Sequence, residues 1–164
     1  MAREVNSKDD ICGYGCGYDY KADDYKLVRV VIDWDSECSH VDVYTSVSNS
    51  WKITKSIPYH LDYQGALYFG LLFNGALHWL AHTFGKDSYI LVCFDVVSEG
   101  FKEVAMPISP IPYPEEDMFH VSVGELGECP CLVFHVRVDV WMMQEYGVGK
   151  SWTKSFSITE ECIP

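Results

Sequence analysis

Val41-Asp42-Val43-Tyr44, with Ser50-Trp51-Lys52 shortly after it, is the first of three similar stretches spaced about 50 residues apart. In each copy a strand-like run ends near one aromatic residue, and a second aromatic follows a turn. The other copies are Val92-Cys93-Phe94-Asp95 with Gly100-Phe101-Lys102, and Val138-Asp139-Val140-Trp141 with Ser151-Trp152-Thr153-Lys154. Repeats of this length, built from several short strands, are typical of propeller blades. The period therefore predicts an all-β fold.

Alternation of apolar and polar side chains indicates that the repeats consist of strands. The predicted strands are 25–32, 41–45 and 51–56; 76–81, 90–95 and 101–105; and 131–136, 138–143 and 152–158. We expect them to belong to three blades of four-stranded antiparallel sheet at about 13–58, 65–109 and 119–164, after an unstructured leader at residues 1–12.

The second aromatic of each repeat has a predicted packing role. Adjacent blades stack face to face, so a large ring at a constant position can fill the wedge between two sheets. Trp51, Phe101 and Trp152 occupy that position. Truncation of any of them to alanine should then cost about 3 to 5 kcal/mol of folding free energy.

Composition and charge limit the classes of partner. The chain has 164 residues, 48% of them hydrophobic, and a net charge of -12. Nucleic-acid recognition needs clustered lysine and arginine, whereas here 12 basic residues are scattered among 24 acidic ones. We therefore predict no nucleic-acid partner. The charge fits either a basic protein partner or a solvated acidic surface without a partner.

The distribution of apolar residues bears on location. Residues 1–10 are polar and charged where a secretory signal would be apolar. The longest apolar stretches, around 67–73 and 76–81, are too short to cross a bilayer. We therefore expect a protein of the cytoplasm, or of the cytoplasm and nucleus, with no membrane partner.

Cysteine and histidine residues were weighed as metal ligands. Seven irregularly spaced cysteines do not indicate a disulfide framework. Cys12 with Cys16, and Cys129 with Cys131, could supply four thiolates to zinc, but neither pair has the usual knuckle spacing, so free thiols are preferred. His78 and His82 lie on a predicted strand, where a spacing of four residues is about 13 Å and excludes a shared metal. We predict no metal and no cofactor.

Two further features invite a ligand-binding or catalytic interpretation. Gly13-x-Gly15-x-Gly17 lacks the spacing of a phosphate-binding loop, so we interpret it as a turn or as a strand packed too closely for side chains. Acidic clusters lie in two predicted loops, at Asp33, Asp35 and Glu37 and at Glu115, Glu116 and Asp117. Paired carboxylates could serve glycoside hydrolysis, but nothing places one in an apolar pocket that would raise its pKa. We predict solvated loop charge and no catalytic residue.

The repeats also contain an ordered series of longer signatures. The first are Gly15-Cys16-Gly17-Tyr18-Asp19, Asp23-Asp24-Tyr25-Lys26-Leu27-Val28-Arg29, and Val43-Tyr44 with Asn49-Ser50-Trp51-Lys52. The others are Phe73-Asn74-Gly75-Ala76-Leu77-His78-Trp79-Leu80, Ile90-Leu91-Val92-Cys93-Phe94-Asp95 with Phe101-Lys102-Glu103-Val104, and Val140-Trp141-Met142-Met143 with Tyr146-Gly147-Val148. The series resembles the plant F-box-associated domain over almost all of residues 13–158. Asp33-Trp34-Asp35-Ser36-Glu37 is similar to the S-locus F-box group.

The resemblance implies a kelch-like β-propeller that binds a protein substrate for an SCF-type ubiquitin ligase and is not itself an enzyme. In such proteins an amino-terminal F-box docks on a Skp-type adaptor while the associated domain holds the target. S-locus members would recognise basic S-RNases in self-incompatibility, which suits the acidic charge. Residues 1–10 contain no F-box, and three blades cannot close a ring, so we expect a fragment with an incomplete propeller.

The resemblance transfers no contact residue, because family contacts lie in variable loops. We expect the contact surfaces at 33–40, 84–88 and 110–120. Two other functions stay open. A carbohydrate-active propeller enzyme would hydrolyse glycans, and an inactive truncated product would unfold at low temperature without cooperativity.

Overall fold

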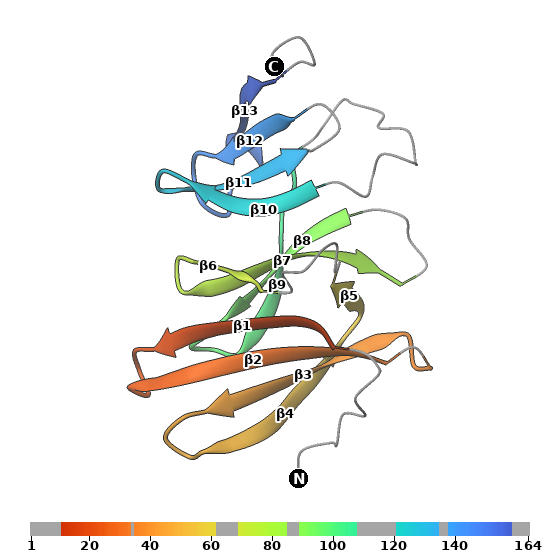
Figure 1. The fold of residues 1–164 in the computed structure, drawn as a ribbon, viewed down its shortest axis with the longest axis vertical. Coiled ribbons are helices and arrows are strands. Elements are labelled where there is room, and N and C mark those ends of the chain that lie inside the picture. Colours follow the sequence, from red (N-terminus) through yellow and green to blue (C-terminus); the bar gives the residue numbers. More distant parts are fainter. Residues whose placement is uncertain are drawn as a thin grey trace. The chain divides into compact units, whose positions relative to one another are not determined.

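The computed structural model describes residues 11–33, 35–61, 69–84, 89–107, 121–134 and 138–158. Within these ranges the regular elements are β-strands, apart from the short 3₁₀ helix η2 (Gly149–Ser151) (Figure 1). The predicted all-β fold is therefore confirmed. No helix in the described ranges has the length and apolar character needed to span a membrane.

The strands form three sheets. Sheet A, in the order β1-β2-β3-β4, consists of β1 (Ile11–Asp19), β2 (Asp24–Asp33), β3 (Cys38–Thr45) and β4 (Ser50–Ile57). Sheet B, in the order β5-β7-β8-β9 with β6 also paired to β7, consists of β5 (Tyr59–Leu61), β6 (Leu71–Phe73), β7 (Ala76–Thr83), β8 (Tyr89–Asp95) and β9 (Gly100–Val104). Sheet C, in the order β10-β11-β12-β13, consists of β10 (Val121–Leu126), β11 (Cys129–Phe134), β12 (Asp139–Met143) and β13 (Trp152–Ser157).

Each predicted strand overlaps an observed one, and the differences lie in strands that were not predicted. Sheets A and C have four strands, but the described part of sheet B has five. The reason is that β5 and β6 are both short and pair with different halves of β7. Sheet B also starts at Tyr59, before the predicted blade start at 65. At the other end, β1 begins at Ile11, so the last two residues of the predicted leader are in a strand, and residues 1–10 lie outside the described residues.

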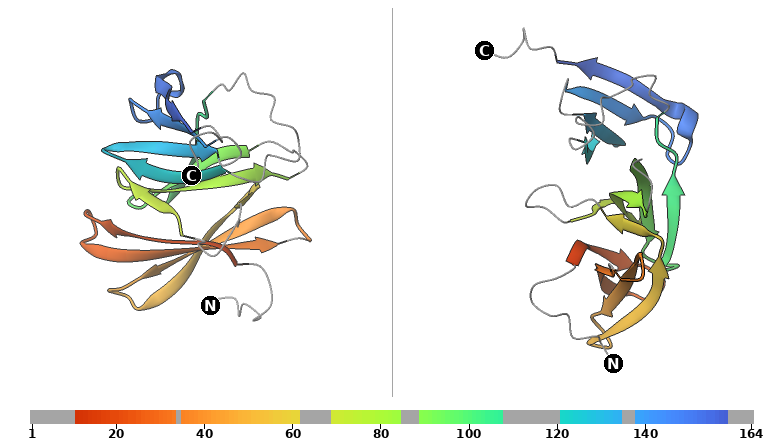
Figure 2. Two further views of the ribbon diagram at one scale, coloured as in Figure 1. Left: turned by 45° about the horizontal axis from the view of Figure 1, so that its top comes forward. Right: turned by 90° about the vertical axis from the view of Figure 1, so that its right-hand side faces the viewer.

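The chain divides into two compact units, Met1–Glu103 and Val104–Pro164. Sheets A and B lie in the first unit except for the last residue of β9, and sheet C lies in the second. The core of the first unit lies between sheets A and B, which form neighbouring layers in both views of Figure 2. Its buried side chains come from both sheets: Val28, Val30, Ile32, Val41, Val43, Ile57, Leu61, Leu77, Trp79, Ala81, Val92, Phe94 and Val96.

Strand β1 explains the glycine motif. Its glycines alternate along the face that lies against sheet B. A Cβ added at Gly15 would lie 2.7 Å from a methyl carbon of Leu77, and one added at Gly17 would lie 2.7 Å from a methyl carbon of Val96. Separations this short are far below van der Waals contact, so only glycine permits this close an approach of the two sheets. The interpretation as a closely packed strand is confirmed.

Phe101 is packed as predicted, whereas for Trp152 the structure shows burial within its own unit, and its wedge role stays a prediction. Phe101 stacks on Trp79, with ring centroids 6.1 Å apart, and packs against the core between sheets A and B. Trp152 is buried in the second unit, where its indole N–H donates to the carbonyl oxygen of Ala105 at 2.6 Å.

Trp51 does not fill a wedge, and that prediction is wrong. The ring belongs to the face of sheet A that carries Tyr44 and Arg29, whereas the core valines alternate onto the opposite face. Trp51 is therefore turned away from sheet B and remains partly exposed. Arg29 covers it, with its guanidinium carbon 4.6 Å from the ring centroid.

Sheets A and C share a buried charged position. Asp42 on β3 is two residues before Tyr44, and Asp139 on β12 is two residues before Trp141, so the two aspartates are equivalent positions of the repeat. Asp42 pairs with Arg29 at 2.5 Å, and Asp139 pairs with Lys154 at 2.8 Å. A hydroxyl of Ser157 also donates to Asp139. Each carboxylate is thus compensated within its own sheet.

Candidate functional site

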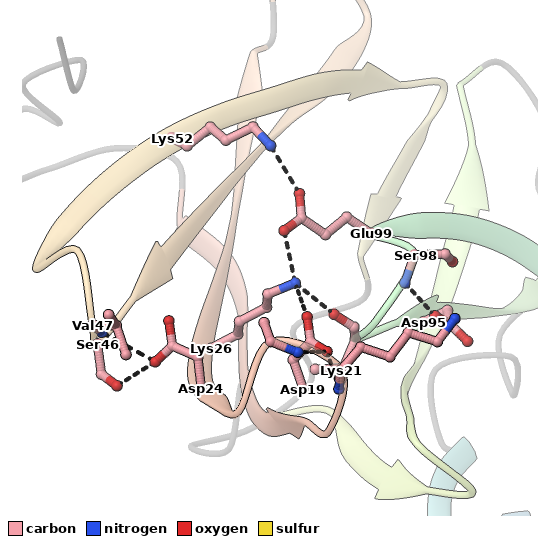
Figure 3. Close-up of polar contacts among 12 residues, drawn as sticks. Asp19, Lys21, Asp24, Lys26, Ser46, Val47, Lys52, Asp95, Ser98 and Glu99 are labelled. Carbon is pink, nitrogen blue, oxygen red and sulfur yellow. Dashed lines mark hydrogen bonds and ion pairs between the residues drawn. The ribbon is translucent and has the colours of Figure 1, made fainter.

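A buried lysine ties the two sheets of the first unit together (Figure 3). Lys26 on β2 shares the face of the core valines and is 5% exposed. Its Nζ lies 2.8 Å from Asp19 at the end of β1 and 2.8 Å from Glu99 in the β8–β9 turn, and it donates to the carbonyl oxygen of Val96 at 3.0 Å. Exposed Lys52 reaches the other oxygen of Glu99 at 3.2 Å. The three acceptors match the three donors of the Lys26 ammonium group.

This pairing keeps all three groups ionised. The hydrogen bond from Lys26, aided by the backbone N–H groups of Ala22 and Lys21, lowers the pKa of Asp19. Burial opposes ionisation of Glu99, but hydrogen bonds from Lys26 and Lys52 outweigh it and lower the pKa of that carboxyl. Burial also disfavours charged Lys26, and its two carboxylate partners outweigh burial and raise the pKa of Lys26. The cluster therefore acts as a structural tie, because a general acid or base needs a pKa near the working pH.

Carboxylates also fix the turns at this end of the unit. Asp24 accepts hydrogen bonds from the hydroxyl of Ser46 and from the backbone N–H of Val47, which joins the start of β2 to the β3–β4 turn (Figure 3). Asp95 accepts from the backbone N–H of Ser98 at 2.6 Å in the β8–β9 turn. The Ser46 hydroxyl lowers the pKa of Asp24, and the Ser98 N–H lowers that of Asp95. The turns are thus held by charge-assisted hydrogen bonds.

Three exposed tyrosines and one exposed valine lie at or next to the turns of this end of sheet A. The group Tyr18, Tyr20, Tyr25 and Val47 is called the tyrosine end below. Tyr20 and Tyr25 are 70% and 68% exposed. The rings of Tyr18 and Tyr25 pack together with centroids 5.1 Å apart, and the Tyr18 hydroxyl donates to Asp23. Tyrosine rings on a rigid support are a common basis of protein–protein contacts.

The opposite end of β2 carries a different chemistry. Asp33, Cys38 and His40, called the hairpin cluster below, each offer one ligand atom, and these atoms lie within 4.8 Å of one another. His40 Nε2 is 3.3 Å from Asp33 Oδ2, and His40 Nδ1 is 3.1 Å from the hydroxyl of Ser56. All three side chains are partly exposed. The β2–β3 hairpin therefore gathers an oxygen, a sulfur and a nitrogen ligand at the protein surface.

The structure describes the predicted contact loops only in part. Most of 33–40 is described. Asp35 and Glu37 are exposed loop residues as predicted, whereas Asp33, predicted to lie in the same loop, is the partly exposed last residue of β2. Phe84 is described, whereas 85–88 and 108–120 lie outside the described residues, together with the acidic cluster at 115–117. Since the structure contains no partner, the prediction of contact surfaces at 33–40, 84–88 and 110–120 stays a prediction.

Several described carboxyl groups have lowered pKa values, and glycoside hydrolysis depends on the pKa of such groups. The Ser36 hydroxyl, followed by His40, lowers the pKa of Asp33. The pKa is also lowered for Asp19, Asp24, Asp95 and Glu99. A glycosidase needs one carboxylic acid with a raised pKa to protonate the leaving group. None of these five carboxyl groups is such an acid.

The histidines and cysteines weighed as ligands lie in separate surroundings. His78 is buried on β7, with Nδ1 3.2 Å from the carbonyl oxygen of Leu71. His82, further along β7, contacts the rings of His60 and Tyr89. The two histidines thus lie on a strand, as predicted.

Five cysteines with described side chains form no disulfide: Cys16, Cys38, Cys93, Cys129 and Cys131. Cys16 is exposed in the first unit. Cys131 is buried in the second, where burial raises the pKa of its thiol.

Sequence reasoning missed both Lys26 and the hairpin cluster. The sequence does contain a signal for Lys26. It is two and four residues before Val28 and Val30, so on a strand its side chain points to the same buried face as theirs. No comparable signal exists for the hairpin cluster. Its ligands are separated along the chain and meet only because the β2–β3 register pairs Asp33 with Cys38.

Comparison with known proteins gives a consistent family assignment. The family described as the F-box associated beta propeller domain matches residues 2–163. The F-box protein CPR1 of Arabidopsis thaliana is 37% identical over 168 residues, which covers 88% of this chain and 40% of that protein. The F-box/kelch-repeat protein At3g23880 of the same plant is 29% identical over 160 residues, covering 94% of this chain and 43% of that protein. These matches confirm the predicted family and the propeller fold class.

The matched region is one part of the relatives. F-box/WD-40 repeat-containing protein 1 of Arabidopsis thaliana is 29% identical over 168 residues, covering 92% of this chain and 40% of that protein. The chain thus spans about two-fifths of the length of the curated relatives that it matches.

Proposed function

The chain belongs to the F-box-associated β-propeller family, and from this membership we propose that it is a non-catalytic module that holds a protein substrate for an SCF-type ubiquitin ligase. The observation that carries the proposal is the family match over residues 2–163, together with relatives whose names identify them as F-box proteins. Skp-type adaptor binding would come from an F-box in the same protein or complex.

The described side chains support binding over catalysis. The pKa values of Asp19, Asp24, Asp33, Asp95 and Glu99 are lowered, which fits their charge pairing and turn capping. The tyrosine end offers aromatic rings with polar tips, and the Lys26 tie holds the sheets that support them. Rigid aromatic anchors cost little conformational entropy on binding.

The net charge of -12 favours a basic target, because opposite charge speeds association and suppresses wrong partners. A basic S-RNase of a self-incompatibility system is the finer form of this proposal, with contacts at 33–40, 84–88 and 110–120. Ubiquitin transfer to such a target takes place inside the cell, so location in the cytoplasm or nucleus is part of the proposal.

The test is affinity purification of the full-length gene product from plant tissue treated with a proteasome inhibitor. We expect the Skp-type adaptor and a basic target to be recovered together. A variant with Tyr20→Ser and Tyr25→Ser should retain the adaptor and recover less target. Lys55→Ser, which changes a different exposed side chain, is the control.

Two outcomes would contradict the proposal. The first is purification that never recovers the adaptor. The second is hydrolysis of a glycan panel that is abolished by substitution of Asp33 or Asp35, which would favour the carbohydrate-active alternative.

A further inference from the structure

We propose that Asp33, Cys38 and His40 form a three-ligand site for a zinc ion on the β2–β3 hairpin. The ligand atoms lie within 4.8 Å of one another, and they come from two paired strands and not from a single loop. The inference goes beyond the proposed function, and its three ligands lie within the predicted contact stretch 33–40.

The Asp33–His40 geometry fits a shared metal better than a direct ion pair. His40 Nε2 and Asp33 Oδ2 are 3.3 Å apart. That is longer than a usual charge-assisted hydrogen bond of about 2.7 to 2.9 Å. Two ligand atoms on a tetrahedral zinc ion, with bonds of about 2.0 to 2.1 Å, are separated by about 3.3 Å. The two side chains are therefore spaced as neighbouring ligands are.

Each ligand is also oriented by a second partner. The Ser56 hydroxyl lies 3.1 Å from His40 Nδ1 and can accept its proton, which directs Nε2 toward the cluster. The backbone N–H groups of Asp35 and Ser36 donate to Asp33 Oδ1 at 3.1 and 3.3 Å, so Oδ2 faces His40. The Ser36 hydroxyl, which donates to Asp33, also lies 2.9 Å from Cys38 Sγ, so the third ligand contacts the same residue.

The chemistry of the three ligand atoms favours zinc over other divalent ions. One thiolate, one imidazole and one carboxylate suit a borderline metal such as Zn²⁺ and disfavour Mg²⁺ and Ca²⁺, which take oxygen ligands. The side chains of Asp33 and His40 are 21% and 27% exposed, so solvent can reach the fourth position. Three protein ligands and one water is a coordination that zinc adopts in proteins.

The first experiment is titration of the full chain with Co²⁺ under reducing conditions. We expect one equivalent to bind, with the visible absorption of tetrahedral Co²⁺ and a thiolate-to-cobalt band in the near ultraviolet. Zn²⁺ should abolish both signals by displacement. Absence of these signals would overturn the proposal.

Substitution of each proposed ligand tests whether the bound Co²⁺ lies at this site. Cys38→Ser should remove the thiolate band, and Asp33→Asn and His40→Gln should each weaken Co²⁺ binding by about 100-fold or more. Cys16→Ser and Asp35→Asn are matched controls that change an exposed thiol and an exposed carboxylate of the same unit, and they should bind as the unmodified chain does. A band that persists in Cys38→Ser would place the metal on other cysteines and overturn the proposal.

Ser56→Ala tests the orientation of His40. Loss of the second partner should weaken binding about tenfold while the tetrahedral spectrum is retained. Circular dichroism identifies any variant that fails to fold. His40→Gln leaves the cysteines in place, so it tests the site even if Cys38→Ser does not fold. Equal Co²⁺ affinity in His40→Gln and the unmodified chain would exclude His40 as a ligand and overturn the proposal.

Discussion

Sheets A and B place the same repeat positions in opposite environments. Phe101 of sheet B packs against Trp79 and the core between the sheets. Trp51 of sheet A is the equivalent residue, yet it lies on the face turned away from sheet B, beneath Arg29. The position two residues before the strand aromatic changes in the same way, from buried Val92 in sheet B to the ion-paired Asp42 in sheet A.

Equivalent residues of the repeats occupy equivalent places in their strands. Whether the side chain at such a place is apolar or charged depends on whether another sheet covers that face. The face of sheet B that carries Phe101 is covered by sheet A and is apolar. The equivalent face of sheet A has a charged pair and a cation–π contact. A buried carboxylate needs a partner, and Arg29 serves both Asp42 and Trp51.

The largest effect on the junction between these sheets is expected for Lys26→Met. The substitution leaves Asp19 and Glu99 without their shared cation, and removal of one member of a buried ion cluster costs about 3 to 5 kcal/mol. Lys52→Met is the matched control, because Lys52 pairs with the same Glu99 but is 71% exposed at its side chain. An exposed pair is worth at most about 1 kcal/mol. Urea unfolding that gives equal losses for both variants would contradict the structural tie.

Acid should weaken the same junction, although less than Lys26→Met because protonation also removes the negative charges. The pKa values of Asp19 and Glu99 are lowered in the folded state from ordinary values of 3.8 and 4.5. Their contribution to stability is therefore complete above those ordinary values and is lost as the pH falls through the folded pKa values. Burial lowers the pKa of His78 from its ordinary value of 6.5, so urea midpoints should already decrease gently below that pH. The loss from Asp19 and Glu99 should add a steeper decrease below about pH 4.5. A midpoint unchanged down to pH 3 would contradict this account.

Phe101→Ala should be the most costly change at a wedge position of the first unit. It removes the ring between Trp79 and Phe94, with which Phe101 has centroid distances of 6.1 and 5.3 Å. Loss of a fully buried phenylalanine costs about 3 to 5 kcal/mol, and because Phe101 is partly buried we expect about 3 kcal/mol. Phe101→Leu should recover part of that loss in urea unfolding, because it refills some of the volume. No difference between the two variants would argue against packing as the cause.

The sequence predicted the features that depend on local pattern. The period of the repeat and the alternation of side chains were sufficient for an all-β fold and for the central strands of each sheet. Signatures such as those around Tyr25 and Trp79 were sufficient for the family. The glycines of β1 were also interpreted correctly, because glycine at every second residue of a strand leaves one face without side chains and so indicates a close neighbour there.

The features that were missed depend on how strands pair and how sheets pack, which the local sequence pattern does not show. Trp51 and Phe101 are equivalent in sequence, and only the arrangement of sheets shows that one is covered and the other is not. Lys26 meets Glu99 across two sheets, and the hairpin cluster depends on strand register. Short strands such as β5 were missed because three residues carry no measurable alternation.

Gly15→Ala tests how closely the two sheets must approach. The added Cβ would lie 2.7 and 2.8 Å from the two methyl carbons of buried Leu77, so the sheets must separate or Leu77 must leave its rotamer. Overpacking of this kind costs about 1 to 3 kcal/mol. Cys16→Ala changes the next residue, which is exposed on the other face of β1, and should have little effect in the same urea measurement. A loss equal to that of Gly15→Ala would mean that β1 itself, and not its contact with sheet B, limits stability.

Trp51→Ala should have the smallest effect and gives the sharpest test of the comparison between the sheets. The ring contributes its contact with Tyr44, at a centroid distance of 5.5 Å, and its cation–π contact with Arg29. Each contact is worth about 1 kcal/mol at a partly exposed site, so the loss should be about 1 to 2 kcal/mol, below that of Phe101→Ala. Part of the loss should disappear when Arg29→Met is already present, because the cation–π contact is then absent. A loss as large as that of Phe101→Ala, measured by urea unfolding of the isolated chain, would mean that Trp51 is covered after all and that the two sheets do not differ as described.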